Sequence, residues 1–365
     1  MKSTEKKADN LRRGWTTGAC ATAAAKTACL GLLTGEFPDP VTITLPGGQT
    51  PAFALAQTHL GEGGATASIV KDAGDDPDVT HGALISVKVS RSAKGSGLHF
   101  LAGPGVGTAT LPGLPIAPGE PAINPAPRKM IAAALKEVTS ALDFNIEISI
   151  KDGEKLALKT LNPRLGIKGG LSILGTTGIV IPFSCAAWID SIHRGVDVAR
   201  ALGHNHIAAS TGDTSEKAVR AFHGLDDQQL IEMGDFIGGT LKYVRNHPVK
   251  RLTLAGGVAK MTKLAQGMLD VHSKRGRADM DGLAQVANEA GASSDLCEQI
   301  RKSNTVAEAF THAAHADIPL GDIIAASAWA TAAKLLEKCD AQLEILIFDR
   351  DGVLQGQAPF RSTLV

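Results

Sequence analysis

Residues 206–216 read HIAASTGDTSE, and this stretch decides the class of fold. Its first five residues, His206–Ser210, form a short apolar run that predicts a strand, and Ser210–Asp213 has the composition of a turn. Asp213 and Glu216 have the spacing of a capping box, which predicts a helix that begins at the turn. Strand, turn and helix in this order form the repeating unit of a parallel α/β sheet.

The rest of the second half follows the same order. A helix is predicted over residues 187–202, where Ile189, Ile192 and Val196 recur at helical spacing and Gly203 ends the pattern. The further predicted elements are a strand at 251–255 that ends in Gly256 and Gly257, helices at 258–269 and 325–339, and a strand at 342–348. This alternation predicts a parallel, Rossmann-like α/β domain over residues 181–365.

The first half has a different pattern. An Ala-rich helix is predicted over residues 16–33, with Thr16 or Thr17 as its cap and Gly31 or Gly35 as its end. Short apolar segments between turn residues predict strands at 41–45, 51–56, 65–70, 84–89, 98–102, 144–150 and 155–161, with a helix at 127–141. We therefore expect an α+β domain with a mixed sheet over residues 1–180.

Composition argues against several classes of protein. The chain has 37 basic and 37 acidic residues and 4% aromatic residues, which argues against a nucleic-acid partner. It contains no apolar run long enough for a membrane span, and residues 1–13 lack the apolar core of a signal peptide. Five cysteines without a C-x-x-C pair predict reduced thiols and a cytoplasmic protein. The oligomeric state stays open, with a homo-oligomer among the options.

The densest polar motif is KDAGDDPDVTHG at residues 71–82, called the aspartate loop below. Its four carboxylates, on Asp72, Asp75, Asp76 and Asp78, are crowded and repel one another. A solvated surface loop and a site that moves protons both account for this crowding. A calcium loop does not, because the spacing departs from D-x-D-x-D-G and no Glu ends the motif.

A second motif, GWTTGAC at residues 14–20, places a Thr pair at the start of the Ala-rich helix. Free backbone N–H groups at a helix start can hold an anion, whereas plain capping by Thr16 or Thr17 is the simpler interpretation. Cys20 is either a thiol activated by the helix start or a small buried apolar residue.

Glycine-rich and basic segments supply the remaining candidates. Residues 166–178 read GIKGGLSILGTTG and lack both the P-loop order and G-x-G-x-x-G. Ligands of open α/β sheets bind outside the carboxyl ends of the strands, where Asp213 can accept hydrogen bonds from a ribose or simply cap a helix. The basic run from Lys260 to Arg277 suits a polycarboxylate or a solvated helix face.

Together these motifs resemble the family of cobalt-precorrin-5B C(1)-methyltransferases. The segments that carry the resemblance are GWTTGACATAAAKTA (14–28), ASIVKDAGDDPDVTHG (67–82), NPRLGIKGGLSILGTTGIVIPFS (162–184), AASTGDTSE (208–216) and AKMTKLAQGMLDVHS (259–273). The resemblance covers roughly residues 13–350. The aspartate loop is the longest and most specific of these motifs.

The resemblance implies methylation of carbon 1 of a cobalt-bearing, ring-contracted tetrapyrrole, which gives cobalt-precorrin-6A in anaerobic cobalamin (vitamin B12) synthesis. It implies S-adenosyl-L-methionine as the methyl donor. Cobalt arrives as part of the substrate, so we expect no metal site on the protein. The family lacks the usual methyltransferase glycine motif near its N-terminus, as this chain does.

Motif position then assigns roles to individual residues. The expected proton acceptors are Asp72, Asp75, Asp76, Asp78 and His81. The expected donor-binding residues are Gly170, Ser172, Gly175, Thr176, Thr177, Ser210, Thr211, Gly212, Asp213, Gly256 and Gly257. The expected contacts to the tetrapyrrole, whose carboxylates favour cations, are Thr16, Thr17, Lys71, Lys168, Lys260, Lys263 and His272.

In one place the chain departs from the family pattern. The family usually reads Gly-His-x-Gly-Lys before the lysine pair, whereas residues 256–260 read GGVAK, so Gly257 stands where the His would be. We assign no catalytic role to this position. Two other interpretations stay open: a tetrapyrrole carrier without catalysis, and an ATP-dependent phosphoryl-transfer enzyme.

Overall fold

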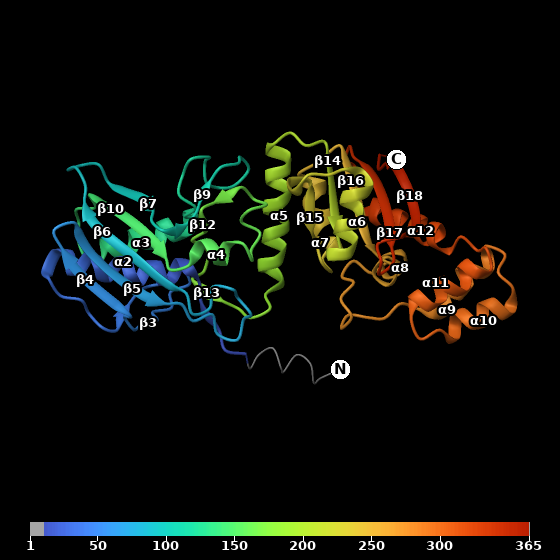
Figure 1. The fold of residues 1–365 in the computed structure, drawn as a ribbon, viewed down its shortest axis with the longest axis horizontal. Helices are drawn as coiled ribbons and strands as arrows, with labels where there is room; N and C mark the ends of the chain where they lie inside the picture. Colours follow the sequence, from blue (N-terminus) through green and yellow to red (C-terminus); the bar gives the residue numbers. More distant parts are fainter. Residues whose placement is uncertain (1–10, 365) are drawn as a thin grey trace. The chain divides into compact units, whose positions relative to one another are not determined.

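The computed structural model describes residues 11–364 and forms two compact units, Met1–Cys185 (unit 1) and Ala186–Val365 (unit 2) (Figure 1). Most of the charged segment at residues 1–13 lies outside the described residues. Among residues 11–364, no helix combines the length and the apolar character that crossing a membrane requires. Each unit has its own core and is described by itself.

Unit 1 contains a five-stranded mixed sheet in the order β4-β5-β6-β10-β7. Its strands are β4 (Gln57–Gly61), β5 (Gly64–Val70), β6 (Leu84–Arg91), β7 (Leu98–Ala102) and β10 (Phe144–Ile150). All neighbours pair antiparallel except β10 and β7, which are parallel. The aspartate loop joins the antiparallel neighbours β5 and β6.

Helix α2 (Thr17–Thr34) packs against this sheet and is almost entirely buried over its first half. Thr16 is its N-cap, with Oγ1 accepting from the Ala19 N–H at 3.1 Å, and Gly35 ends it with φ 81. Alanine and glycine on every side let β5, β6 and α3 (Pro125–Lys136) approach closely. The predicted Ala-rich helix is confirmed.

Two-residue strands tie the loops of unit 1 together. The pairs are β1 (Gly14–Trp15) with β13 (Ile179–Val180), β2 (Val41–Thr42) with β3 (Ala52–Phe53), β8 (Gly105–Val106) with β12 (Gly170–Leu171), and β9 (Thr108–Ala109) with β11 (Ile167–Lys168). The Gly-rich stretch 166–178 is therefore part of the packed body of unit 1.

Some predictions for unit 1 are wrong. Residues 155–161, predicted as a strand, lie in α4 (Gly153–Ala157) and a following turn, because Glu154–Ala157 are good helix formers. The strands predicted at 41–45 and 51–56 shrink to β2 and β3. Strand β4 was not predicted because its residues are all exposed and mostly polar.

Unit 2 is built on a second five-stranded sheet in the order β15-β14-β16-β17-β18. Its strands are β14 (His206–Ser210), β15 (Leu230–Glu232), β16 (Arg251–Gly257), β17 (Gln342–Phe348) and β18 (Leu354–Ser362). The first four strands are parallel, and β18 is antiparallel to β17. The carboxyl ends of four strands therefore meet at one edge of the sheet.

Helices cover both faces of this sheet (Figure 1). Helix α6 (Asp213–His223) packs on one face with Ala208, whereas Ile207 and Ala209 face the larger core on the other side. The larger core also contains residues of α5 (Cys185–Ala201), α7 (Ile237–Asn246), α8 (Val258–Ala265) and α12 (Leu320–Leu335). Burial on both faces is typical of parallel sheets.

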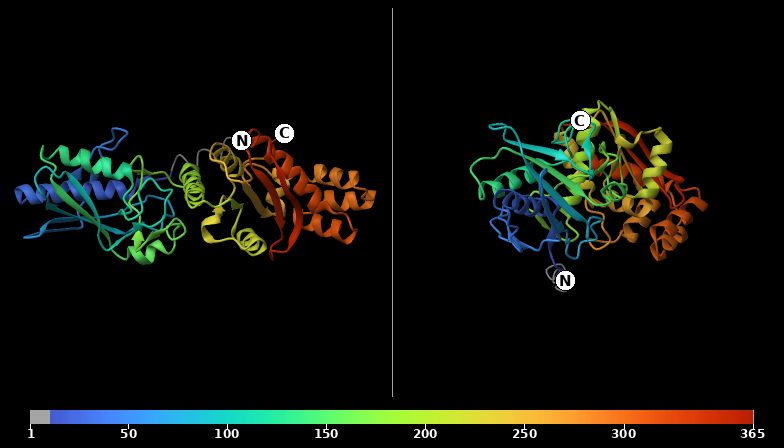
Figure 2. Two further views of the ribbon diagram at one scale, coloured as in Figure 1. Left: turned by 90° about the horizontal axis from the view of Figure 1, so that it is seen from above. Right: turned by 60° about the vertical axis from the view of Figure 1, so that its left-hand side comes forward.

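Three further helices, α9 (Met280–Glu289), α10 (Ser294–Lys302) and α11 (Val306–His315), form a cluster beside the sheet of unit 2 (Figure 2). They were not predicted, although each has a Ser, Thr or Asp cap. The helix predicted at 258–269 ends at Ala265, and the one predicted at 325–339 begins at Leu320.

The predicted capping box at the start of α6 is wrong. Gly212 occupies the N-cap position, and Asp213 is already the first helical residue. Asp213 Oδ2 instead accepts from Lys217 Nζ at 2.7 Å, one turn further along the helix. A glycine N-cap leaves the entry to this helix without a side chain.

Candidate active site

The aspartate loop is closed at its base by backbone hydrogen bonds. Lys71 N donates to Ala83 O at 2.9 Å, and Gly82 N donates to Lys71 O at 2.8 Å. Gly82 has φ 77, a conformation that favours glycine. The loop therefore leaves the sheet and returns to it at one point, and its carboxylates are confined to a small region.

Lys71 and Asp78 form a buried ion pair inside the loop. Lys71 Nζ lies 2.6 Å from Asp78 Oδ2, and the Lys71 side chain is only 1% exposed. The other oxygen, Asp78 Oδ1, accepts from Thr80 N at 2.7 Å and from Thr80 Oγ1 at 2.6 Å. Burial works to raise the pKa of Asp78, but Lys71 and Thr80 outweigh it and hold the pKa below its usual value.

Asp72 is held by Arg12. Arg12 Nη2 donates to Asp72 Oδ1 at 2.9 Å, Arg12 Nη1 contacts the other oxygen, and Gly74 N donates to Oδ1 at 2.9 Å. The hydrogen bonds from Arg12 and from the Gly74 amide lower the pKa of Asp72 to about 2. A carboxylate of this kind binds protons weakly at neutral pH.

The chain segments around Gly14 and Gly74 cross in close contact. Trp15 N donates to Asp72 O at 2.7 Å, and Asp75 N donates to Arg12 O at 2.9 Å. A Cβ on Gly14 would lie 2.0 Å from the Ala73 carbonyl carbon, so this crossing requires glycine. Residues 12–15, which include β1, thereby hold the aspartate loop in place.

The carboxylates of Asp75 and Asp76 each accept a hydrogen bond from a backbone amide. Asp75 Oδ2 accepts from Arg12 N at 2.6 Å, and Asp76 Oδ1 accepts from Phe183 N at 2.8 Å. Phe183 has φ 56, which a bulky residue rarely adopts, and its side chain is exposed. Sequence reasoning missed Arg12 and Phe183, which no local pattern marks as partners of the loop.

His81 lies at the exposed end of the loop. Its Nδ1 accepts from Ala73 N at 3.1 Å, so this nitrogen carries no proton. The same Nδ1 lies 3.8 Å from Asp72 Oδ1, a distance that becomes an ion pair only if the ring is protonated.

Hydrogen bonds join the start of α2 to the Gly-rich stretch. Thr17 Oγ1 accepts from Leu174 N at 3.0 Å, and Gly18 N donates to Leu174 O at 3.0 Å. A Cβ on Gly175 would lie 2.4 Å from the Thr16 side chain. The amides of Gly18 and Ala19 are thus occupied, which supports capping over anion binding. Cys20 is buried, and burial raises its pKa to about 12.

The other predicted site residues of unit 1 form a buried group and an exposed group. Gly170 and Ser172 are buried, and Ser172 Oγ donates to Asn162 Oδ1 at 3.3 Å. Thr176, Thr177 and Lys168 are exposed. The structure brings the Gly-rich stretch to the start of α2, and its expected role in donor binding stays a prediction.

In unit 2 the structure brings together the turns that follow β14 and β16. Thr211 N donates to Ala255 O at 2.9 Å, and a Cβ on Gly256 would lie 2.9 Å from Thr211 Oγ1. Gly212 and Gly257 are the N-caps of α6 and α8. Ser210–Asp213 and Gly256–Gly257 are therefore neighbours at one edge of the sheet.

Asp235 and Lys260 complete this region, which we call the strand-end cluster: Ser210, Thr211, Asp235, Gly256 and Lys260. Lys260 Nζ donates to Thr211 O at 2.7 Å and lies 3.0 Å from Asp235 Oδ1. Asp235 follows the short strand β15, and sequence reasoning missed it. The available signal was the apolar pair Leu230 and Ile231 followed by a glycine and an acid.

Lys263 and His272, the other two residues of unit 2 predicted to contact the tetrapyrrole, form hydrogen bonds with nearby backbone atoms. Lys263 is buried, and its Nζ donates to Val271 O at 3.1 Å. His272 Nδ1 accepts from Lys274 N at 3.1 Å. Lys263 therefore stabilises the segment after α8, and its ammonium is not on the surface.

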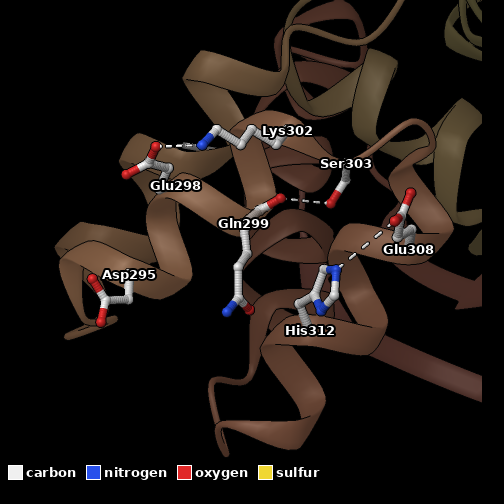
Figure 3. A pocket seen from close by; sticks show the side chains of 7 residues that line it. All are labelled: Asp295, Glu298, Gln299, Lys302, Ser303, Glu308 and His312. Carbon is white, nitrogen blue, oxygen red and sulfur yellow. Dashed lines mark hydrogen bonds and ion pairs between the residues drawn. The ribbon is translucent and has the colours of Figure 1, made fainter.

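A surface pocket of 430 Å³ lies between α10 and α11, away from every predicted site residue (Figure 3). Its lining residues are Asp295, Glu298, Gln299, Lys302, Ser303, Glu308 and His312. Its polar side chains contact one another: Lys302 Nζ is 2.6 Å from Glu298 Oε1, and His312 Nε2 is 4.0 Å from Glu308 Oε1. We do not place the active site there. Within residues 11–364, no group of His, Cys, Asp and Glu is arranged to hold a metal.

Unit 2 thus has a mostly parallel α/β sheet with glycine-rich, polar turns at its carboxyl edge, the edge at which open α/β sheets bind ligands. The chain matches the CbiD family model over residues 4–182 and the CbiD C-terminal domain model over residues 270–359. The cobalt-precorrin-5B C(1)-methyltransferase of Agrobacterium fabrum is 62% identical over 95% of this chain and 93% of its own length. The protein of that name from Halorhodospira halophila is 58% identical over 95% and 94%.

The chain therefore belongs to the CbiD family. A solved structure, the cobalamin biosynthesis protein (cbiD) from Archaeoglobus fulgidus, is 28% identical to it. The similarity covers 73% of this chain and 83% of that chain, with a TM-score of 0.40.

Proposed function

We propose that this chain transfers a methyl group from S-adenosyl-L-methionine to carbon 1 of cobalt-precorrin-5B, giving cobalt-precorrin-6A. The observation that carries the proposal is the extent of the match to relatives with this activity in their name, at 62% identity over 95% of the chain. Both the aspartate loop and the strand-end cluster lie inside the matched length. The cobalt belongs to the tetrapyrrole substrate and is not a resident ion of the protein.

The donor is placed in unit 2. Numbered from β14, the sheet has the order 2-1-3-4-5, in which the direction of winding changes between β14 and β16. Ligands of such Rossmann-like, doubly wound sheets bind at this change of direction, outside the strand ends. The strand-end cluster stands at that position. Gly212 and Gly257 have open space where a side chain would begin, which leaves room for a ligand.

The reaction is a displacement at carbon. The bond from sulfur to the methyl carbon breaks, a bond to carbon 1 of the macrocycle forms, and S-adenosylhomocysteine leaves. The positive charge that reaches the macrocycle is removed when a proton leaves to a base. The protein supplies position and a proton acceptor, and positioning alone is worth several orders of magnitude in rate.

Asp75 and Asp76 are the strongest candidates for the proton acceptor. Arg12 holds the pKa of Asp72 at about 2, and Asp78 is tied to the buried Lys71, so both are weak bases. His81 has its unprotonated nitrogen occupied by Ala73 N. Within residues 11–364, Asp75 and Asp76 each accept one hydrogen bond, from a backbone amide, and their second carboxylate oxygens accept none. Lys168, which is exposed, remains a candidate for pairing with a substrate carboxylate.

Calorimetric titration of the purified protein with S-adenosylhomocysteine tests this proposal, with ATP and magnesium in a parallel titration. We expect micromolar binding of S-adenosylhomocysteine and no heat from ATP. If S-adenosylhomocysteine gives no heat, a repeat with a bound corrinoid separates ordered binding from a carrier that has no donor site. Binding of ATP with magnesium alone would favour a phosphoryl-transfer enzyme.

A further inference from the structure

The strand-end cluster contains a buried polar atom that the described part of the chain leaves without a partner. Ser210 is fully buried, and its Oγ has no hydrogen-bond partner within residues 11–364. Asp235 Oδ1 is also buried; it makes an ion pair with Lys260 Nζ at 3.0 Å and accepts no hydrogen bond in the described chain. Buried polar atoms nearly always have partners. The unpaired Ser210 Oγ at this sheet edge is what a site completed by a ligand would show.

Asp235 is placed to accept hydrogen bonds from a ribose. It follows β15, the strand next to β14, and so stands beside the change of direction in the sheet. Its two oxygens accept and cannot donate when ionised, which matches a pair of neighbouring hydroxyl donors. Its side chain is 23% exposed, so a ligand can reach it, and Lys260 fixes it to the turn after β14.

Trp188 supplies a flat apolar surface beside Asp235. The indole Nε1 donates to Glu232 O, the last residue of β15, at 3.3 Å. Ring atoms lie 3.4 to 3.5 Å from the position that a Cβ on Gly234 would take, so the ring lies against the turn that precedes Asp235. Trp188 is 42% exposed. An exposed, anchored aromatic ring is a surface on which a purine base stacks.

We propose that Asp235 and Trp188 bind the nucleoside half of the methyl donor: Asp235 accepts hydrogen bonds from the ribose hydroxyls, and Trp188 stacks on the adenine. This inference rests on the proposed function, in which the donor is an adenosyl sulfonium. It replaces Asp213 as the ribose partner, because the Asp213 side chain is 77% exposed and bonded to Lys217.

The test is calorimetry with two probes, S-adenosylhomocysteine and its 2′-deoxy analogue, on three proteins. Wild type is expected to bind S-adenosylhomocysteine about 10- to 100-fold more tightly than the analogue, because the analogue lacks one donor to a charged acceptor. Asp235→Asn is expected to lose most of this preference. Asp227→Asn is the matched control, since Asp227 precedes the same strand at its other end and pairs with Arg220 on the surface.

The probe comparison separates a ribose contact from a general loss of structure. If Asp235→Asn weakens both probes equally, the effect is structural and the inference fails. If Asp235→Asn keeps the full preference of wild type, the inference fails and the proposed function stands. If wild type binds neither probe, with or without a corrinoid, the proposed function itself fails. Trp188→Leu is expected to weaken both probes alike, by about 5- to 100-fold, as the loss of a stacked base predicts.

Discussion

The aspartate loop and the strand-end cluster differ in how many of their polar groups have hydrogen-bond partners within the protein. In the loop, each of Asp72, Asp75, Asp76 and Asp78 accepts hydrogen bonds from nearby residues. In the strand-end cluster, Ser210 Oγ and Asp235 Oδ1 are buried without hydrogen-bond partners in the described residues. The more conspicuous motif is thus largely satisfied by its own fold, whereas the quieter one is where we propose that a ligand binds.

The largest effect is expected at Asp75 and Asp76, the two loop carboxylates that accept hydrogen bonds from backbone amides. One of these two residues is the proposed proton acceptor. Its replacement by alanine, Asp75→Ala or Asp76→Ala, should lower turnover by about 10²- to 10⁴-fold. S-Adenosylhomocysteine affinity should stay near wild type, because the donor is placed in unit 2. Glu154→Ala, at an exposed position on α4, is the control. Near-normal turnover of both aspartate variants would remove the proton-transfer role from the loop.

The buried ion pair of the loop should matter most for stability. Lys71→Met leaves Asp78 without its cation, and breaking a buried pair costs about 3–5 kcal/mol. Lys217→Met breaks the exposed Lys217–Asp213 pair and should cost less than about 0.5 kcal/mol. Urea denaturation measures both values. Equal, small losses would mean that the loop is not held together by Lys71.

Two adjacent glycines at the sheet edge should differ in how well they tolerate alanine. A Cβ on Gly256 would lie 2.6 Å from Met261 Sδ and 2.9 Å from Thr211 Oγ1, so Gly256→Ala should destabilise by about 1–3 kcal/mol. Gly257 has φ −72, and its nearest neighbour to a Cβ is Phe348 O at 4.0 Å, so Gly257→Ala should fold normally. Thermal melts compare them. A destabilised Gly257→Ala beside a normal Gly256→Ala would contradict the packing described for this edge.

The last prediction concerns a difference in acid response between the units. Burial first, then the charges of His223 and Arg251, lower the pKa of His206 to about 4. The unfolded chain then binds more protons than the folded one between pH 6.5 and 4, so the stability of unit 2 falls as pH falls through this window. Asp72, with a pKa of about 2, contributes stability to unit 1 that is lost only as pH falls from 3.8 toward 2.

His206→Gln checks this pH dependence because glutamine does not titrate. Urea midpoints measured from pH 7 to 4.5 should decline less steeply for the variant than for wild type. Equal slopes for both proteins would show that another group controls the acid response of unit 2.

The sequence predicted regular elements well where one pattern dominates. The limits of β7, β10, β14 and β17 match the predicted ones, because each is an apolar or alternating run bounded by turn residues. Residues 155–161 failed because a short run of helix formers also reads as apolar alternation. Helices α9 to α11 had cap residues but were overlooked in a polar stretch.

The candidate site was likewise predicted only in part. The turns after β14 and β16 were both assigned to donor binding, since both follow apolar strands and ligands of open α/β sheets bind outside the strand ends; the structure brings the two turns together. Asp235 was missed because β15 spans only Leu230–Glu232 and gives little periodic signal. The partners Arg12 and Phe183 of the aspartate loop lie 60 and 107 residues from the carboxylates they contact, and no local pattern encodes such contacts.

The most direct test of the account is the fate of the methyl group. Purified protein is incubated with cobalt-precorrin-5B and S-adenosyl-L-methionine labelled in its methyl group, under anaerobic conditions, and the tetrapyrrole is examined by mass spectrometry. The account predicts that each macrocycle gains one labelled methyl group while S-adenosylhomocysteine appears in equal amount. A macrocycle that binds but keeps its mass would contradict it and identify the chain as a carrier.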